Sequence, residues 1–284
     1  MSLFTRRAIT GVLAAIAAIS FANAALAQTT LQKIRKQGYI RIGFANEAPY
    51  SYATASGKLT GESPSVFKYV MKKLGVNEVD GVLTEWGSLI PGLKAGRFDA
   101  IVASMYITPK RCKQVIFANP TYAIGEAFIV KKGNPDGVNT FADAIKKDLK
   151  IAFIAGTVEV RYAKMAGLSR EQWLIVPNFA SGVAAVTAGR ASAVALTSLT
   201  AKDLAAKDDA IERAKPFTFT HNGKSYKGEG SFAFRKEDAS LRDAVNAQLA
   251  KFIGTPAHLA MIKPFGFDKS NLPDKTTAQL CAGK

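Results

Sequence analysis

Short apolar runs typical of buried strands alternate along the chain with segments in which apolar residues recur every three or four positions. The strand-like runs cover residues 39–45, 79–84 and 98–106. Helical spacing occupies residues 63–75 and 86–96, and each of these segments ends in glycine. This alternation predicts right-handed strand–helix–strand units built on a parallel sheet.

A weak internal repeat predicts a second unit of similar plan. Residues 89–105 and 181–198 both read as a helix, then Ala-Gly-Arg, then an apolar strand. Between them, residues 149–168 read as a strand, a Gly-Thr turn and a helix. Two glycine-led strands, 125–134 and 228–237, are expected to carry the chain between the units.

These patterns predict an α/β fold of two lobes, each a mixed, mostly parallel sheet flanked by helices. Lobe 1 is expected to be discontinuous, formed by residues 28–124 and 229–284, with a C-terminal helix at 238–253. Lobe 2 is expected to span residues 125–228. Ligands of open α/β sheets bind at the carboxyl ends of the strands, so the cleft between the lobes is the expected site.

The first 27 residues are typical of a cleaved export signal. Two arginines, Arg6 and Arg7, precede an apolar run of small residues that closes on Ala-Leu-Ala at 25–27. Cleavage near Ala27 and Gln28 would leave 257 residues, which is enough for two lobes with separate cores. No later stretch is long and apolar enough to span a bilayer. The expected location is the periplasm.

The charge balance does not indicate a nucleic-acid-binding protein. The formal net charge is +16, or +14 without the two arginines of the signal segment. The basic residues are scattered over predicted helices and are not interleaved with aromatic residues. Only His221 and His258 are histidines, and neither lies in a catalytic motif or at metal-ligand spacing. We therefore expect no metal and no cofactor.

Two cysteines, Cys112 and Cys281, remain in a compartment that favours oxidation. A disulfide between them is the first interpretation, and two separate buried thiols are the alternative. The disulfide would tie the C-terminal tail to the helix that begins near residue 109.

The segment Ser-Met-Tyr-Ile-Thr-Pro-Lys-Arg-Cys-Lys at 104–113 suggests an anion site. Thr108 is a good helix N-cap, and Pro109 suits the first helical position, where no N–H group is needed. Arg111 then falls in the first turn, where the helix dipole disfavours a cation. A cation beside free N–H groups binds anions strongly. The alternative is an arginine that points into water.

Other polar and aromatic residues are predicted to converge on the same cleft because each follows a strand. Each aromatic residue taken alone would be assigned to the core, but three at successive strand ends, near an acid and a base, favour a binding site. The candidate ligand-binding residues are Glu47, Tyr50, Trp86, Tyr106, Arg111, Thr157 and Thr197.

These residues suit a compact zwitterion with a delocalised positive charge. Arg111 would hold its carboxylate, and Glu47 would face its cationic N–H group. The three aromatic rings could enclose the cation at about 0.5–2 kcal/mol per favourable contact. Catalytic equipment is sparse, since the sequence has no recognisable triad, metal cluster or phosphate loop, and Glu47 has no evident partner for acid–base work. An enzyme is therefore not expected.

The whole mature chain resembles the periplasmic solute-binding proteins of polar amino-acid ABC importers. The residues that carry this resemblance are ITPKR (107–111), LIPGLKAGRFDAI (89–101), AGT (155–157) and FAFRKEDASLRDAVNAQLA (232–250). Within that family the chain is similar to the ectoine/hydroxyectoine-binding proteins, on the segments IRIGFANEAPY, LTEWGSLIPGLKAGRFDAI, YITPKRCKQVIFANP and GEAFIVKKGNP.

This resemblance implies a type II binding-protein fold, a monomer, and an ABC importer permease as partner. It implies that Arg111 holds the carboxylate of ectoine, that Glu47 faces the amidinium, and that Tyr50, Trp86 and Tyr106 form an aromatic box. Two departures from the general amino-acid pattern agree with the narrower match. Tyr106 stands where Ser or Thr is usual, and Thr197 stands where an Asp usually pairs with the α-ammonium group.

Several alternatives remain open at this stage. Val158 replaces a frequent hydroxyl residue, so the contacts from lobe 2 are less well defined than those from lobe 1. A general binding protein for polar or basic amino acids is the main alternative. The same fold also occurs in periplasmic cyclohexadienyl dehydratases and in ligand domains that report to a receptor.

Overall fold

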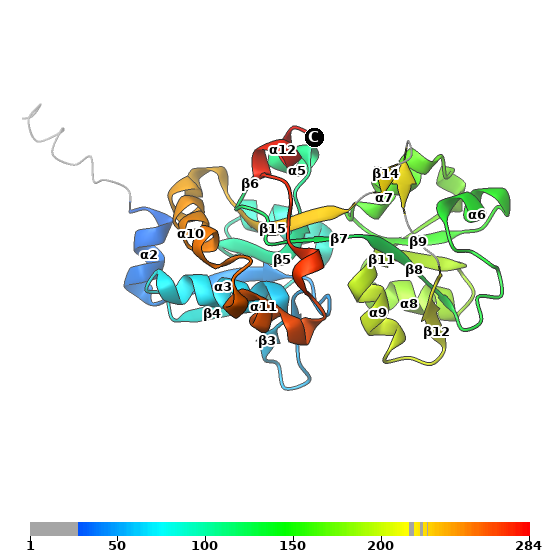
Figure 1. The fold of residues 1–284 in the computed structure, drawn as a ribbon, viewed down its shortest axis with the longest axis horizontal. Helices are drawn as coiled ribbons and strands as arrows, with labels where there is room; N and C mark the ends of the chain where they lie inside the picture. Colours follow the sequence, from blue (N-terminus) through cyan, green and yellow to red (C-terminus); the bar gives the residue numbers. More distant parts are fainter. Residues whose placement is uncertain (1–27, 216–218, 222–223, 226) are drawn as a thin grey trace, which may run out of the picture.

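The computed structural model describes residues 28–215, 219–221, 224–225 and 227–284. The predicted signal segment, residues 1–27, lies outside this part of the chain. The described residues form two α/β units that lie side by side, each around its own sheet (Figure 1).

The first unit, which we call lobe 1, contains a six-stranded mixed sheet. Its strands are, in order, β4 (Glu78–Leu83), β1 (Tyr39–Phe44), β5 (Ala100–Tyr106), β15 (Gly228–Phe234) and β6 (Ile116–Phe117), with β7 (Tyr122–Ile124) also paired to β15. Strand β1 runs parallel to β4 and β5, whereas β15 runs antiparallel to β5. Every residue of β5 and β15 is buried, as expected for central strands covered on both faces.

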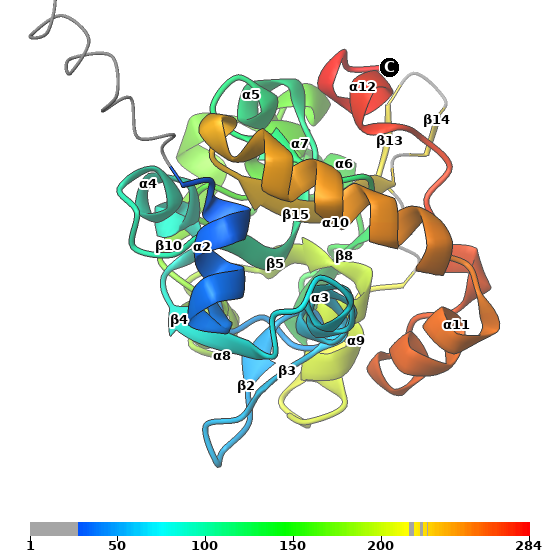
Figure 2. The ribbon, with the colours of Figure 1, turned by 90° about the vertical axis from the view of Figure 1, so that its left-hand side faces the viewer.

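Helices cover both faces of this sheet, and Figure 2 shows α2, α3 and α10 together on one of them. The helices of lobe 1 are α2 (Thr30–Gln37), α3 (Glu62–Lys73), α4 (Leu89–Lys94), α5 (Pro109–Cys112), α10 (Ala239–Phe252), α11 (Pro256–Ile262) and α12 (Thr277–Cys281). Its short elements are β2 (Tyr52–Ala53), β3 (Leu59–Thr60), η1 (Trp86–Ser88), η3 (Lys236–Asp238), η4 (Lys263–Phe265) and η5 (Lys269–Asn271).

The second unit, lobe 2, contains a five-stranded mixed sheet. Its strands are, in order, β10 (Trp173–Val176), β9 (Ile151–Ile154), β11 (Ala193–Thr197), β8 (Glu126–Lys131) and β12 (Ile211–Arg213). The other elements are α6 (Phe141–Lys146), α7 (Glu159–Ala166), η2 (Arg170–Gln172), α8 (Phe179–Thr187), α9 (Ser198–Ala205), β13 (Thr220–His221) and β14 (Lys224–Ser225). Strand β9 is parallel to β10 and β11, and β8 is antiparallel to β11 and β12.

The strands and helices predicted from apolar periodicity all form. The predicted helix at 86–96 divides into the short η1 and α4, because the turn at Trp86–Ser88 is tighter than an α-helix. The antiparallel strands β8 and β15 make both sheets mixed. The chain passes from the sheet of lobe 1 to the sheet of lobe 2 between β7 and β8, at residue 125.

A disulfide joins Cys112 of α5 to Cys281 of α12, with the two Cα atoms 5.7 Å apart. The predicted pairing is therefore confirmed, and separate thiols are wrong. The bond closes a loop across a sequence separation of 169 residues and holds the C-terminal helix against the helix that carries Arg111.

We expect loss of this disulfide to loosen the tail more than the binding pocket. The double variant Cys112→Ser/Cys281→Ser should lose about 2–5 kcal/mol of unfolding free energy, because a long loop is no longer closed in the unfolded chain. Amide hydrogen exchange should rise first in α12. Faster exchange around residues 104–111 than in α12 would contradict this expectation.

Candidate functional site

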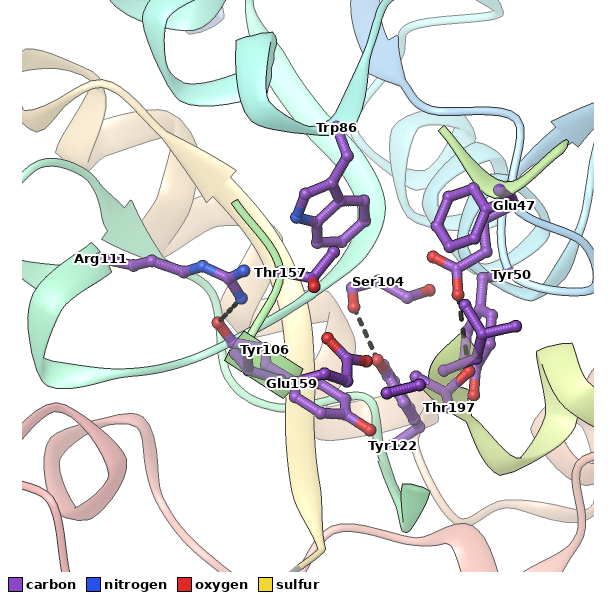
Figure 3. A pocket seen from close by; sticks show the side chains of 14 residues that line it. Glu47, Tyr50, Trp86, Ser104, Tyr106, Arg111, Tyr122, Thr157, Glu159 and Thr197 are labelled. Atoms are coloured by element: carbon purple, nitrogen blue, oxygen red, sulfur yellow. Dashed lines mark hydrogen bonds between the residues drawn. The ribbon is translucent and has the colours of Figure 1, made fainter. Parts of the chain in front are cut away.

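A pocket lies between the lobes and is lined by fourteen residues from both (Figure 3). All seven residues predicted from the sequence line it: Glu47, Tyr50, Trp86, Tyr106, Arg111, Thr157 and Thr197. The lobes touch each other around the pocket. At one edge, Asn178 Nδ2 of lobe 2 donates to Glu85 Oε1 of lobe 1 over 3.2 Å.

Arg111 is positioned by the short helix α5. Thr108 caps this helix by accepting from the N–H group of Arg111 over 3.3 Å, and Pro109 occupies the first turn, as predicted. The guanidinium group is turned into the pocket and not into water, because only 7% of Arg111 is exposed. Its Nη1 donates to Tyr106 O (2.8 Å), and its Nη2 donates across the lobes to Gly156 O (3.2 Å).

The charge of Arg111 has no ionic partner among the residues that the structure describes. Burial lowers the pKa of the guanidinium, and the negative charge of Glu159 opposes this effect. A buried cation that bonds only to neutral carbonyl groups favours an anionic ligand group. The predicted use of the first-turn N–H groups is only partly possible, since the N–H of Arg111 is already bonded to Thr108.

Glu47 lies in a tight turn after β1, where its backbone exchanges hydrogen bonds with Ser51. Its carboxylate reaches lobe 2, where Oε1 accepts from the hydroxyl group of Thr200 (2.7 Å) and lies 3.5 Å from the hydroxyl oxygen of Thr197. Burial raises the pKa of the Glu47 carboxyl to about 8; the charge of Glu159 adds to this rise, and the Thr200 hydrogen bond opposes it. A buried carboxyl with no cationic neighbour favours a ligand that carries a cationic group.

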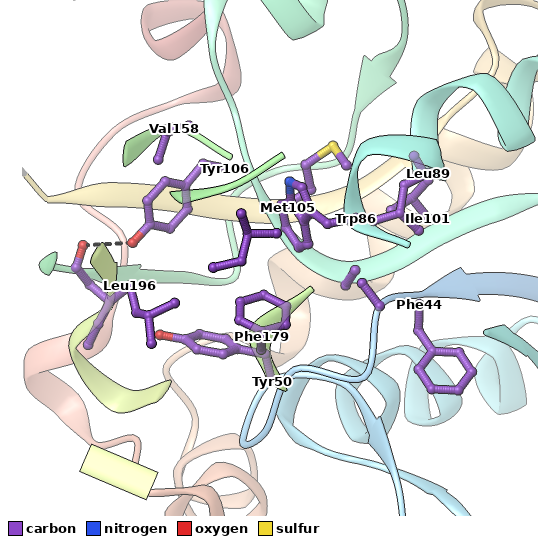
Figure 4. Packing of buried hydrophobic residues seen from close by; sticks show 14 of the residues in the cluster. Phe44, Tyr50, Trp86, Leu89, Ile101, Met105, Tyr106, Val158, Phe179 and Leu196 are labelled. Atoms are coloured by element: carbon purple, nitrogen blue, oxygen red, sulfur yellow. Dashed lines mark hydrogen bonds between the residues drawn. The ribbon is translucent and has the colours of Figure 1, made fainter. Parts of the chain in front are cut away.

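The aromatic residues form walls on both sides of the pocket. The indole of Trp86 donates from Nε1 to Gly156 O over 3.3 Å, and its ring lies 5.6 Å from the guanidinium carbon of Arg111. The hydroxyl of Tyr106 donates to Ile124 O over 3.2 Å. Phe179 of lobe 2 belongs to the same buried apolar cluster as these lobe 1 side chains (Figure 4).

Two glycines of β15 make room for the tyrosine rings. A Cβ atom on Gly228 would lie 1.9 Å from the ring of Tyr106, and one on Gly230 would lie 2.4 Å from the ring of Tyr122. Strand β15, which follows lobe 2 in the sequence, therefore determines how closely these two tyrosine rings can pack in lobe 1.

Sequence reasoning missed several residues that shape the pocket. They are Ser104, Tyr122, Glu159 and Phe179 in the lining, and Thr200 behind it. Glu159 follows the Gly-Thr turn that the sequence analysis singled out, so its position after a strand was an available signal. The others gave no signal, because Tyr122 and Phe179 resemble ordinary core residues.

A second buried carboxyl, that of Glu62, lies behind the pocket lining and contacts Ser104. Glu62 is fully buried, burial raises its pKa to about 7, and its Oε2 accepts from the hydroxyl of Ser104 (3.0 Å). Tyr122 donates to the carbonyl of the same serine over 2.6 Å. Ser104 has a φ of 49°, a conformation that these two bonds help to hold.

The described residues contain no group of three or more His, Cys, Asp or Glu side chains arranged to hold a metal ion. None of the helices that these residues form has the length and apolar character needed to cross a bilayer.

Two mixed α/β lobes around an interlobe pocket define the type II periplasmic binding-protein fold. Residues 40–261 match the family of bacterial extracellular solute-binding proteins, family 3, and the chain belongs to this family. It is thus a solute-binding protein of the amino-acid ABC transporter type, as the resemblance in the sequence predicted.

Similar proteins agree with this assignment. A probable amino-acid ABC transporter periplasmic-binding protein of Sinorhizobium fredii, y4tE, is 38% identical over 92% of this chain and 89% of its own. The lysine/arginine/ornithine-binding periplasmic protein of Escherichia coli is 28% identical over 75% of this chain and 81% of its own.

Similar solved structures include a binding protein with its ligand and an ancestral binding protein that is the precursor of an enzyme. The crystal structure of EhuB in complex with hydroxyectoine has a TM-score of 0.80 and 36% identity, covering 90% of this chain and 98% of EhuB. The ancestral amino acid-binding protein AncCDT-1, a precursor of cyclohexadienyl dehydratase, has a TM-score of 0.72 and 30% identity, covering 84% of this chain and 99% of its own.

The raised pKa of Glu47 leads to a prediction about proton release. Below about pH 8 the free carboxyl holds a proton, and a cationic ligand that favours the ionised form must displace it. Binding should therefore release up to about one proton between pH 6 and 8, and affinity should rise with pH by up to about tenfold per unit. Calorimetric titration in buffers of different ionisation enthalpy measures this release.

A matched control separates Glu47 from Glu62, another buried carboxyl of lobe 1. Glu62→Gln should keep the buffer dependence, because Glu62 lies behind Ser104 and does not line the pocket. A binding enthalpy that is independent of buffer in the unmodified protein would mean that Glu47 is ionised before the ligand arrives.

Proposed function

We propose that this protein captures a small zwitterion, ectoine or 5-hydroxyectoine, outside the cytoplasm and delivers it to an ABC importer. The supporting observation is a buried guanidinium and a buried carboxyl in one aromatic-walled pocket. Arg111 and Glu47 are both buried, and neither has an ionic partner among the described residues. A ligand with a carboxylate and a delocalised cation would satisfy both groups at once.

Each predicted contact has a counterpart in the pocket lining. Arg111 would bind the carboxylate in a planar, two-pronged manner. Glu47 would accept from an amidinium N–H group, and the rings of Tyr50, Trp86 and Tyr106 would lie against the ligand. Thr157 and Thr197 would contribute hydroxyl groups from lobe 2.

The structural neighbour EhuB supports the choice of ligand. Its crystal contains hydroxyectoine, and its likeness to this chain extends over nearly the whole of both proteins. We further propose that residues 28–124 and 229–284 move as one lobe and 125–228 as the other, with export directed by residues 1–27 and the mature protein acting as a monomer in the periplasm.

A general amino-acid-binding protein is the second candidate, because several relatives are named for amino acids. The residue at position 197 argues against it. Thr197 lines the pocket and is half-buried, and its hydroxyl group donates to Thr200 over 2.9 Å. An α-ammonium group directed at this position would meet no negative charge from Thr197.

Arg111 is the first residue to test. Arg111→Ala should weaken ectoine binding by about 3 kcal/mol, or more than about 100-fold, since the buried carboxylate loses a charge-assisted partner. Arg111→Lys should recover only part of this loss because it lacks the planar fork. Calorimetry gives the affinities, and thermal unfolding checks the fold. Affinity close to that of the unmodified protein in Arg111→Ala would place the carboxylate elsewhere.

The second test is selectivity. Ectoine should bind at least about tenfold more tightly than glutamine, arginine or histidine, because a poorly paired ammonium group in a closed pocket costs about 1–3 kcal/mol. Trp86→Ala should weaken ectoine more than any residual amino-acid binding. Equal or tighter binding of a common amino acid would favour the general importer instead. Incubation with cyclohexadienyl acids, followed by product analysis, tests for dehydratase activity.

A further inference from the structure

The pocket contains a second carboxylate, Glu159, which neither the sequence pattern nor the proposed ligand contacts above account for. Glu159 is the first residue of α7 in lobe 2 and lines the pocket, yet only 5% of it is exposed. Its Oε2 atom is buried and accepts no hydrogen bond from any described residue. An acid at a helix start is favourable, but this alone does not explain burial with an unsatisfied oxygen.

The surroundings of Glu159 indicate what it could bind. Figure 3 shows its carboxylate on the side of Tyr106, whereas the carboxylate of Glu47 lies on the side of Tyr50. Glu47 belongs to lobe 1 and Glu159 to lobe 2, so a ligand between them would be held from two edges. The negative charge of Glu159 opposes the lowering of the Arg111 pKa by burial, but the two groups do not form an ion pair.

A third carboxyl, Glu126, lies beside Glu159 but outside the pocket lining. Both of its oxygens are buried and accept from no donor in the described residues. Burial raises the pKa of Glu126 well above its ordinary value, and the neighbouring charge of Glu159 raises it further. Two carboxyls this close do not readily ionise together, so a Glu126 that stays neutral leaves the negative charge on Glu159, which lines the pocket.

The pocket therefore has an excess of hydrogen-bond acceptors with negative charge. Its lining contributes two carboxylates and one guanidinium. Aromatic walls alone would accept any small cation, including a quaternary ammonium ion with no N–H group. Two carboxylates on different sides of the pocket also require N–H donors on two edges of the ligand, because each carboxylate needs a donor when water is excluded.

We infer that Glu159 is a second ligand-binding carboxylate, and that the pocket selects cations with N–H groups on two separate edges, such as cyclic amidiniums, over quaternary ammonium ions. The inference rests on the proposed function in that the solute is a small zwitterion. It adds the class of cation and the role of lobe 2. Closure of the lobes would bring Glu159 onto the second N–H group after Glu47 and Arg111 have bound the first edge and the carboxylate.

The test compares three solutes with the unmodified protein and two variants. Ectoine has two N–H edges and a carboxylate, glycine betaine has a carboxylate and no N–H group, and arginine has a guanidinium with N–H groups on several edges. Glu159→Gln removes the charge with little change in shape. Glu171→Gln is the matched control, because Glu171 also lies in lobe 2 but is exposed. Calorimetry, with competition for weak ligands, gives the affinities, and thermal unfolding checks that each variant folds.

We expect Glu159→Gln to weaken ectoine about tenfold to a hundredfold, since a buried charge-assisted hydrogen bond is lost, and Glu171→Gln to leave it unchanged. Glycine betaine should bind the unmodified protein more weakly than ectoine, and Glu159→Gln should not weaken it further. An ectoine loss below about fivefold in Glu159→Gln, or an equal loss for glycine betaine, would overturn the inference.

The outcomes separate this inference from the proposed function. If arginine binds the unmodified protein more tightly than ectoine and Glu159→Gln abolishes that preference, the ectoine assignment fails and the role of Glu159 stands. If ectoine binds tightly and Glu159→Gln has no effect, the function stands and the role of Glu159 fails. Binding of none of the three solutes by the unmodified protein would overturn both.

Discussion

The pocket depends on the burial of a base, Arg111, and an acid, Glu47, that do not pair with each other. Removing Arg111 and Glu47 from water is costly, and neither cost is offset by an ion pair within the described residues. Carbonyl groups of Tyr106 and Gly156 partly solvate the guanidinium, and hydroxyl groups of lobe 2 partly solvate the carboxyl. A zwitterionic ligand would offset the rest of this desolvation cost by giving each group an ionic partner.

The contacts that solvate these charges also join the lobes. Gly156 O of lobe 2 accepts from both Trp86 and Arg111 of lobe 1, and Thr200 of lobe 2 donates to Glu47. Closing the pocket and satisfying its charges are thus the same event. This coupling suits a protein that must hold its solute in a closed form and release it when the lobes separate.

The rigid scaffold under the pocket explains how the aromatic walls keep their geometry. Strand β15 places Gly228 and Gly230 against the rings of Tyr106 and Tyr122, where no larger residue fits. Glu62 and Tyr122 hold Ser104 from two sides. The disulfide between α5 and α12 braces the helix that carries Arg111. Precise pockets need such support, because a ligand gains little from groups that must first be ordered.

The sequence alone determined the alternation of strands and helices, the two lobes, the cap at Thr108 and the candidates that follow each strand. These features follow from local periodicity and from the rule that parallel strands end at one edge. Only the tertiary structure decided which core-like residues line the pocket, as with Tyr122, Phe179 and the partner hydroxyl of Thr200. It also decided that Glu159 is buried without a donor and that Glu126 lies beside it. Burial and pairing between residues far apart in the chain depend on how the two lobes meet, and no local pattern encodes that.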